Sequence, residues 1–152
     1  MNFRFSPYLI TIIAVAGFIV RAMYWYPLLP DTIAIHFGMD GMANNWSSKL
    51  DFMIIISCLI CLLIVMFFGL TLLLKKVPDT MINLPNNEYW LSAERRASTL
   101  HAIVLFLNEI GSRTVLLIAV VFELTCRANA SFHQQLDTQT FLIVFGMYLF
   151  GV

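Results

Sequence analysis

The feature that most constrains this chain is a set of apolar runs long enough to cross a membrane. A hydrocarbon core of about 30 Å takes roughly 20 helical residues. Three runs reach this length, at about residues 7–25, 50–74 and 100–126. The chain is also 60% hydrophobic and only 12% charged, whereas a soluble domain is about 25% charged. We therefore expect an integral membrane protein and not a soluble enzyme domain.

A fourth apolar run, about residues 140–152, is shorter than the other three. As a helix it would be only about 18 Å long. It is either a re-entrant segment or an incomplete span, and we favour the span. The predicted fold is an all-α membrane protein, one polytopic domain over residues 1–152. It is a bundle of about four transmembrane helices with a compact extracytoplasmic loop.

The basic residues in the short connections predict how the bundle is oriented. Cytoplasmic connections carry an excess of Lys and Arg. With the N-terminus in the cytoplasm, Lys49 and Arg127 lie outside, and five basic residues lie inside: Arg4, Lys75, Lys76, Arg95 and Arg96. We therefore expect residues 26–49 and 127–139 outside and residues 75–99 in the cytoplasm.

The first connection, residues 26–49, has more internal order than a random loop. Pro27 and Pro30 fix φ and stiffen its start. Gly38 and the pair Asp40-Gly41 favour a turn. Apolar residues recur before that turn at every second position, as in a short strand: Ile33, Ile35 and Phe37. We expect an extended arm on the membrane surface that returns to the second helix through Trp46.

Polar residues predict where the second and third helices begin. Ser48 and Asp51 form a capping-box pattern, in which the serine oxygen and the carboxylate can satisfy free N–H groups. Ser92, with Glu94 in the first turn, favours a helix start after the second connection. Trp90 and its neighbour Tyr89 lie just before that start, where an interfacial aromatic anchor is expected.

Both connections carry motifs. LPDTIAIHFGMDGMANNWSSK resembles the LP-x-x-I-x-x-HF-x-x-x-G-x-x-x-x-W-x-x-K signature of a bacterial membrane domain, the domain-of-unknown-function family DUF1648. That domain is also found at the N-terminus of SdpI-type immunity proteins. The later INLPNNEYWLSAERRASTL is similar to the INLPN-x-x-YWL-x-x-ERR segment of small stand-alone members. The signature positions matched are Leu29, Pro30, Ile33, His36, Phe37, Gly41, Trp46 and Lys49.

The resemblance implies a bacterial inner-membrane protein and suggests immunity or signalling against a toxic peptide. We expect a non-catalytic sensor, immunity or regulatory protein that binds a peptide or a membrane-protein partner, besides the lipid bilayer, through the first connection. Nine basic and nine acidic residues cancel, so no net field favours nucleic acid. No cofactor or metal is expected, and a homo-oligomer is compatible with the sequence. The candidate binding residues are Pro30, Asp31, His36, Phe37, Gly41, Trp46 and Lys49.

The motif in the second connection has two interpretations. Its arginines suit a positive-inside anchor that leads into the third helix. The same segment could instead form a cytoplasmic partner site. The residues of this motif are Asn83, Pro85, Asn86, Trp90, Arg95 and Arg96.

The sequence allows several roles for His36 in the first connection. It could hydrogen-bond within its own loop, or bind a ligand or respond to pH, since histidine titrates near neutral pH. With Asp31 and Asp40 nearby it could also hold a metal or act as a general base, although the spacing matches no standard zinc motif. We favour the role within the loop, and an intramembrane hydrolase is the third choice of function.

Four charged residues fall well inside the apolar runs, where charges are costly and usually face protein or water: Arg21, Glu109, Arg113 and Glu123. Glu109 and Arg113 are four residues apart with the acid first, a favourable order on a helix. Glu123 returns to nearly the same face as Glu109. Arg21 and Glu123 each lie about one turn from the outer surface, so we expect their side chains to approach each other. This charged stripe either joins helices or serves the alternative function, a subunit of a transport or ion-conducting complex.

The three cysteines do not form a complete chemical motif. Cys58 and Cys61 make a C-x-x-C inside an unbroken apolar run, and Cys126 is distant in sequence. A redox or zinc site would need a βαβ setting or a second ligand pair. We expect all three to be buried apolar side chains.

Overall fold

The computed structural model describes residues 6–151, apart from the side chains of residues 70 and 75. Its helices are α1 (Pro7–Trp25), α2 (Lys49–Ile64), α3 (Leu70–Leu73), α4 (Asn87–Trp90), α5 (Arg96–Ala130) and α6 (Thr138–Phe150). A π-helical turn, η1 (Val65–Gly69), joins α2 to α3, and the 3-10 turns η2 (Leu74–Lys76) and η3 (Asp79–Met81) follow. Strands β1 (Thr32–Phe37) and β2 (Ala43–Ser48) form a hairpin between α1 and α2.

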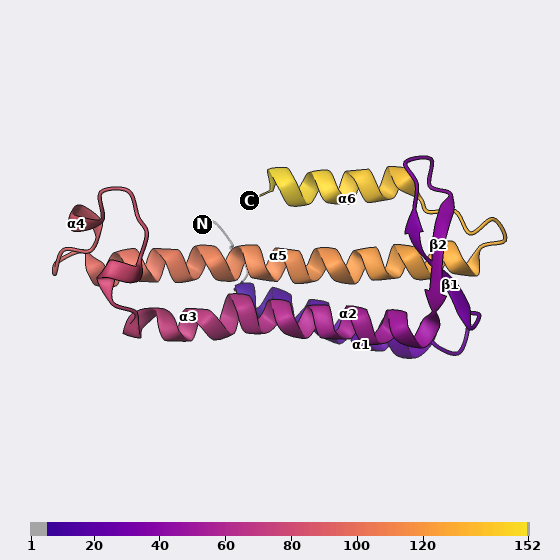
Figure 1. Cartoon of the computed structure of the whole chain (residues 1–152), viewed down its shortest axis with the longest axis horizontal. Coiled ribbons are helices and arrows are strands. Elements are labelled where there is room, and N and C mark those ends of the chain that lie inside the picture. Colours follow the sequence, from indigo (N-terminus) through magenta and orange to yellow (C-terminus); the bar gives the residue numbers. More distant parts are fainter. Residues whose placement is uncertain (1–5, 152) are drawn as a thin grey trace.

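The long helix α5 is the axis of an elongated bundle (Figure 1). In this view α1 and α2 lie below α5, and α6 lies above the half of α5 that is nearer the hairpin. The hairpin is at one end of the bundle, and the segment that contains α4 is at the other. The two predicted outer connections therefore share one end.

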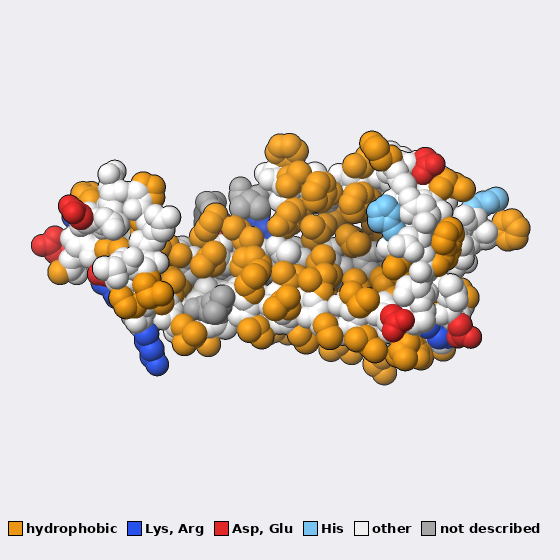
Figure 2. All heavy atoms as spheres, in the orientation of Figure 1, with side chains coloured by type: hydrophobic (Ala, Val, Ile, Leu, Met, Phe, Trp, Pro, Cys, Tyr) orange, Lys and Arg blue, Asp and Glu red, His pale blue; other side chains and the backbone are white. Residues whose placement is uncertain are grey.

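Three helical segments of the described chain are long and apolar enough to cross a membrane: Pro7–Trp25, Lys49–Leu73 and Arg96–Ala130. On the face shown in Figure 2, hydrophobic side chains cover the middle of the bundle, and most charged and histidine side chains gather at its two ends. These are the features of a membrane protein. Helix α6 is apolar but has only 13 residues, so the fourth span stays a prediction.

Phe122 of α5 joins three helices in the half of the bundle near the hairpin. Its fully buried ring packs edge-on against Phe18 of α1, with 4.9 Å between ring centroids, and stacks on Phe52 of α2 at 5.7 Å. Both are favourable arrangements for aromatic rings. Val115 and Cys126 are fully buried on either side of Phe122 along α5, so the core follows this helix.

The other half of the bundle is held by a polar contact and a close approach. Asn108 of α5 is 1% exposed; it donates to the Tyr8 hydroxyl at 3.0 Å and accepts from the Thr71 hydroxyl at 3.3 Å. Gly111, one turn further along α5, faces Phe67 of η1. A Cβ on this glycine would lie 2.7 Å from Cγ of Phe67, so only glycine allows the two helices to pack this closely.

The first connection folds as a two-stranded antiparallel hairpin and not as a single extended arm. Its register shifts between Ala34 and His36 and again before Phe37, because bulges insert unpaired residues and break the twofold period. As a result, Ile33 and Ala34 are both fully buried, while Ile35 is exposed. The predicted alternation is therefore wrong in detail, and the all-α prediction is corrected by one small sheet.

Two helix N-caps were predicted, at Ser48 and at Ser92. The side-chain cap of Ser48 is confirmed, and that of Ser92 is not. The Asp51 N–H donates to Ser48 Oγ at 3.0 Å at the start of α2. The predicted Ser92 side-chain cap is wrong, because this residue instead uses its carbonyl oxygen to accept from the N–H groups of Arg95 and Arg96. Helix α5 has 35 residues and extends beyond the predicted 100–126, since polar residues continue the helix past the apolar run at both ends.

The cysteines only partly meet the prediction. Cys126 is buried in the core. Cys58 and Cys61 are exposed on α2, so the prediction of burial is wrong for these two. An apolar run indicates membrane residence, but it does not distinguish side chains that face lipid from those that face protein.

Candidate functional site

The predicted approach of Arg21 on α1 to Glu123 on α5 is confirmed. The Arg21 guanidinium donates from Nε to Glu123 Oε2 at 2.8 Å and from Nη2 to Oε1 at 2.7 Å. This two-point geometry is the strongest form of an arginine–carboxylate contact. It joins α1 to α5 one turn below the hairpin.

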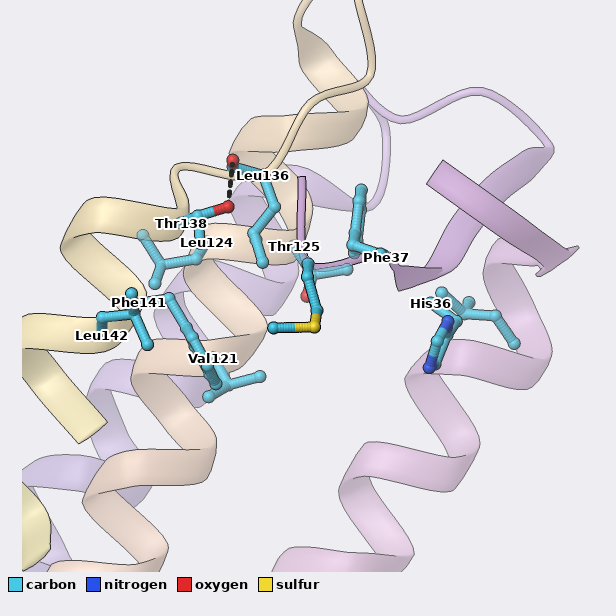
Figure 3. Close-up of a pocket in the computed structure, with 12 residues that line it drawn as sticks. His36, Phe37, Val121, Leu124, Thr125, Leu136, Thr138, Phe141 and Leu142 are labelled. Carbon is cyan, nitrogen blue, oxygen red and sulfur yellow. Dashed lines mark hydrogen bonds between the residues drawn. The ribbon is translucent and has the colours of Figure 1, made fainter. Parts of the chain in front are cut away.

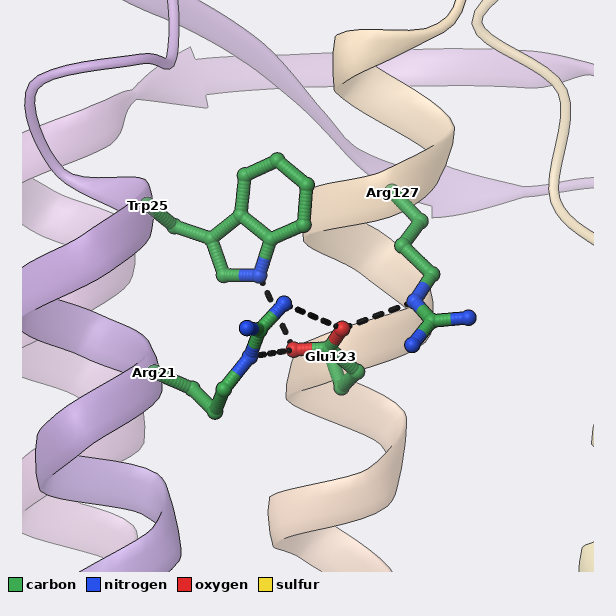
Figure 4. Close-up of polar contacts among 4 residues, drawn as sticks. All are labelled: Arg21, Trp25, Glu123 and Arg127. Atoms are coloured by element: carbon green, nitrogen blue, oxygen red, sulfur yellow. Dashed lines mark hydrogen bonds and ion pairs between the residues drawn. The ribbon is translucent and has the colours of Figure 1, made fainter.

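Two more donors complete the site, which we call the Glu123 cluster (Figure 4). The Trp25 indole donates to Glu123 Oε2 at 2.9 Å, and Arg127 Nε donates to Oε1 at 2.7 Å. The sequence places Arg127 in the outer connection, whereas the structure places it on α5. The Glu123 cluster thus consists of one carboxylate and three donor side chains: Arg21, Trp25 and Arg127.

Glu109 and Arg113 form the second ionic contact of the predicted stripe. Arg113 Nη2 lies 2.7 Å from Glu109 Oε1, and the two side chains are 28% and 30% exposed, respectively. Glu109 and Glu123 are 14 residues apart on α5, or roughly 21 Å. The predicted stripe therefore consists of two ionic sites far apart along one helix.

Asn129, at the last turn of α5, holds the hairpin in place. Its side-chain amide accepts from the Ala34 N–H at 2.6 Å and donates to the Ala34 carbonyl at 2.8 Å, as a neighbouring strand would. It also donates to the carbonyl of Thr125 at 2.9 Å. Since Asn129 and Ala34 are both buried, these bonds satisfy backbone groups that water cannot reach.

The hairpin turn is held by the segment that leads into α6. Gly41 has a φ of +78°, which favours glycine, and a Cβ there would lie 2.7 Å from the Leu136 carbonyl oxygen. The Leu136 N–H donates to the Gly41 carbonyl at 2.9 Å. The Trp46 indole donates to the side-chain carbonyl of Gln134 at 3.3 Å. The signature glycine and tryptophan therefore both contact residues 134–136.

The three residues considered for metal or acid–base chemistry lie in separate contacts. The His36 ring nitrogen Nδ1 lies 2.5 Å from the Asn44 side-chain oxygen, within the hairpin. Asp31 pairs with Lys49 at 3.1 Å, and Asp40 accepts from the Met42 N–H. Among the residues that the structure describes, no three His, Cys, Asp or Glu side chains are grouped to hold a metal ion.

A cavity of about 470 Å³ lies between the hairpin, α5 and the start of α6. In Figure 3, Val121 and Leu124 of α5 and Phe141 of α6 lie on one side, and His36 and Phe37 of β1 lie on the other. Most of its lining is apolar. The only members of the predicted binding set that line this cavity are His36 and Phe37. It can accommodate an apolar group and offers a single imidazole at its edge.

The remaining predicted residues of the hairpin lie at its base. The Lys49 ammonium donates to the Leu29 carbonyl at 3.2 Å and lies over the Tyr26 ring at 5.2 Å. Pro30 and Asp31 are exposed beside it. These residues connect the hairpin to α1 and α2, so they hold it in place and do not line the cavity.

The motif in the second connection mainly holds its own loop. Arg96 pairs with Asp79 at 2.7 Å, and the Arg95 guanidinium lies over the Tyr89 ring at 4.1 Å. The other motif residues are exposed: Asn83, Pro85, Asn86 and Trp90. They do not contact the cavity at the opposite end, and a partner site there stays a prediction.

Three side chains make contacts at this end of the bundle that the sequence did not predict: Asn129, Trp25 and Arg127. Asn129 lies beyond the apolar run, and no sequence rule links it to a strand 95 residues away. Arg127 could have been found, because it is four residues after Glu123 and so lies on the same helix face. Extending the third helix by one turn would have revealed this pair.

Residues 12–61 match a protein-family model described as a domain of unknown function, DUF1648. The matched segment runs from α1 through the hairpin into α2 of this chain. The match confirms the resemblance to this domain. No curated protein and no solved structure matches the chain.

Proposed function

We propose that this chain is a non-catalytic membrane protein that binds an apolar peptide at the cavity between the hairpin, α5 and α6. The cavity is the observation that carries the proposal. Ligand sites are typically concave and largely apolar, with a few polar groups that set orientation. Apolar side chains such as those of Val121, Leu124 and Phe141 dominate this lining, and the polar groups come from His36, Thr125 and Thr138.

The fixed position of the hairpin supports a binding role. The Asn129 amide holds Ala34, and the Leu136 N–H holds Gly41. These contacts position β1 beside the cavity before any ligand arrives. A preorganised site loses less conformational entropy when it binds.

The charges around the cavity favour a cationic peptide. Residues 26–49 carry two Asp and one Lys, and residues 131–139 carry one Asp, so these two segments together carry three acids against one base. Asp40 and Asp137 are the acids next to cavity-lining residues. Complementary charge increases the association rate and selects among peptides.

The biological setting follows from the same features. The excess of Lys and Arg in the connection 75–99 supports a cytoplasmic location for that end, and the hairpin would then face outward from the inner membrane. A peptide bound from outside fits a sensor, immunity or regulatory protein, the role suggested by the resemblance to SdpI-type proteins.

A subunit of a transport or ion-conducting complex is the second candidate. Its support is the presence of charges at bilayer depth. Its weakness is that Glu109 pairs with Arg113 and Glu123 pairs with Arg21, and the two glutamates are roughly 21 Å apart along α5. The peptide-binding function has the stronger support.

The proposal can be tested with the protein in phosphatidylcholine nanodiscs and a synthetic amphipathic peptide of lysine and leucine that carries a photo-crosslinker. We expect crosslinks to concentrate on the hairpin tip, where Met39 is 99% exposed, and on the start of α6. A glutamate and leucine peptide of the same pattern should crosslink less, because the connections are acidic.

Two valine substitutions on α5 provide the test and its control. Val121→Phe fills the cavity and should reduce crosslinking several-fold. Val104→Phe adds the same bulk at a half-buried valine in the other half of α5 and should leave crosslinking unchanged. If the two variants behave alike, or if crosslinks spread evenly around the bundle, the peptide-binding function is wrong.

A further inference from the structure

The Glu123 cluster carries more positive than negative charge. Two guanidinium groups, Arg21 and Arg127, contact the single Glu123 carboxylate at 2.7 Å each. Trp25 adds a neutral donor. The cluster therefore has a net charge of one positive unit. An excess positive charge near the bilayer surface attracts anionic headgroups, so an anion is expected close to this site.

The arginines leave room for such an anion. The Glu123 side chain is 17% exposed, whereas Arg21 and Arg127 are 39% and 66% exposed. Among the hydrogen bonds of the described residues, Arg127 donates only through Nε. Figure 4 shows one of its terminal nitrogens directed away from Glu123. A planar guanidinium with two open donors matches the geometry of a phosphate.

The aromatic residues around the cluster indicate its depth. Tyr24 lies against the Arg21 guanidinium, 4.6 Å from the ring centroid, and is 52% exposed. Tyr26 is also exposed, and Trp25 belongs to the cluster itself. Tyrosine and tryptophan concentrate at the boundary between hydrocarbon and headgroups. The open donors of Arg127 thus lie at the level of the lipid phosphates.

We infer that the Glu123 cluster binds the phosphate of an anionic phospholipid through the exposed edge of Arg127, next to Arg21. Among the described residues, Glu123 is the acid that pairs with these two arginines: Asp31 is paired with Lys49, and Asp40 and Asp137 accept hydrogen bonds within their own segments. Glu123 keeps the two arginines in place, and the lipid neutralises the remaining positive charge. The site is separate from the peptide cavity and does not depend on the proposed function.

The other ionic contacts of the bundle provide natural controls. Arg96 and Asp79 form a pair with one charge of each sign at the opposite end, and their side chains are 32% and 46% exposed. The exposure of Arg96 is close to that of Arg21. A balanced pair gives no reason for an additional anion, so Arg96 should not select anionic lipid.

The test measures lipid retention by native mass spectrometry of the purified protein. Phosphatidylglycerol, phosphatidylcholine and inorganic phosphate are the three probes. We expect phosphatidylglycerol to stay bound to the unmodified chain and about tenfold less to Arg127→Gln, the size of change that loss of one charge-assisted contact gives. Arg127→Lys should retain part of the binding, and Arg96→Gln should retain all of it.

The result that overturns the inference is equal retention of phosphatidylglycerol by the unmodified chain and Arg127→Gln. Arg127→Gln leaves the contact between Arg21 and Glu123 intact, and unchanged thermal unfolding would show that the fold is kept. If the variant does not fold, the intermediate affinity of Arg127→Lys decides the question, since no loss in that variant also contradicts the inference. Displacement of the lipid by inorganic phosphate would overturn a lipid as the occupant and assign the site to a free phosphate ion.

Discussion

The two ends of the bundle are built in different ways. At the hairpin end, contacts join residues that are far apart in the sequence: Ala34 with Asn129, and Arg21 with Glu123, at separations of 95 and 102 residues. At the other end, Arg96 contacts Asp79 only 17 residues away. Thr99 contacts the carbonyl of Trp90, nine residues away.

The difference indicates which end has a fixed shape. The hairpin end is held by the packing of α1, α5 and the segment before α6, so the cavity exists only when the whole bundle is formed. The connection at the other end is held by contacts with the first turn of α5, which is close to it in sequence. A binding site that needs fixed geometry is therefore expected at the hairpin end.

Loss of the Asn129 amide is the strongest test of this comparison. Asn129→Ala leaves the buried N–H and carbonyl of Ala34 without partners, and each orphaned group costs about 1–3 kcal/mol. We expect the free energy of unfolding to fall by roughly 2–5 kcal/mol, measured by denaturant titration in mixed micelles. Asn83→Ala, at an exposed residue of the other end, should change it by less than about 0.5 kcal/mol. If both substitutions lower the free energy of unfolding by the same amount, the hairpin end is not more tightly packed than the other end.

Gly41→Ala should have the next largest effect. The positive φ costs a non-glycine residue about 1–2 kcal/mol, and the new Cβ would overlap the Leu136 carbonyl and the Thr138 hydroxyl. We expect a loss of roughly 2–4 kcal/mol in the free energy of unfolding. Gly38→Ala is the control, since its Cβ would meet mainly the end of the Asp40 side chain and not backbone. If the Gly38 variant is as unstable, the contact with residues 134–138 does not hold the turn.

The two ionic sites on α5 should also differ. Glu123→Gln removes the charge that two arginines share across helices, and we expect a loss of about 1–3 kcal/mol, below the value for fully buried pairs because the arginines are partly exposed. Glu109→Gln affects a pair within one helix turn, worth about 0.5 kcal/mol or less. A double-mutant cycle with Arg21→Gln measures the first coupling directly. A coupling near zero would mean that the cluster does not join α1 to α5.

Much of this arrangement could be predicted from the sequence. The features that could not be predicted were missed for one common reason. Arg21 and Glu123 could be paired because both lie one turn from the same surface and an unpaired charge is costly there. The strand at residues 32–37 was visible in its apolar pattern. Its partner β2 was not visible, because the sequence ANNWSS has neither apolar alternation nor β-branched residues.

The missed contacts are those between a polar side chain and a distant backbone. Asn129 acts as a substitute strand for Ala34, and Gly111 makes room for Phe67. Neither function depends on residues nearby in the sequence, so local periodicity contains no signal for it. Burial of Cys58 and Cys61 was wrongly predicted for a related reason. In an unbroken apolar span, the sequence does not show which face of the helix contacts lipid.

The smallest expected effect concerns the start of α6, where the hairpin end depends on a single cap. The side-chain and backbone hydrogen bonds from Thr140 lower the pKa of Asp137 below its ordinary value of 3.8. A lowered pKa in the folded state means that the stabilisation is present above the ordinary pKa and is lost as the pH falls through the folded value. The protection factor of the Thr140 amide, which is its intrinsic exchange rate divided by the observed rate, should therefore stay high at neutral pH and fall only in strong acid. Asp137→Asn can still accept the Thr140 N–H, so its exchange should not depend on pH in this way beyond the intrinsic rate. If acid reduces protection at Thr140 equally in both proteins, the Asp137 cap does not cause the change. Loss of the contact between Gly41 and Leu136 would then be the first explanation to test.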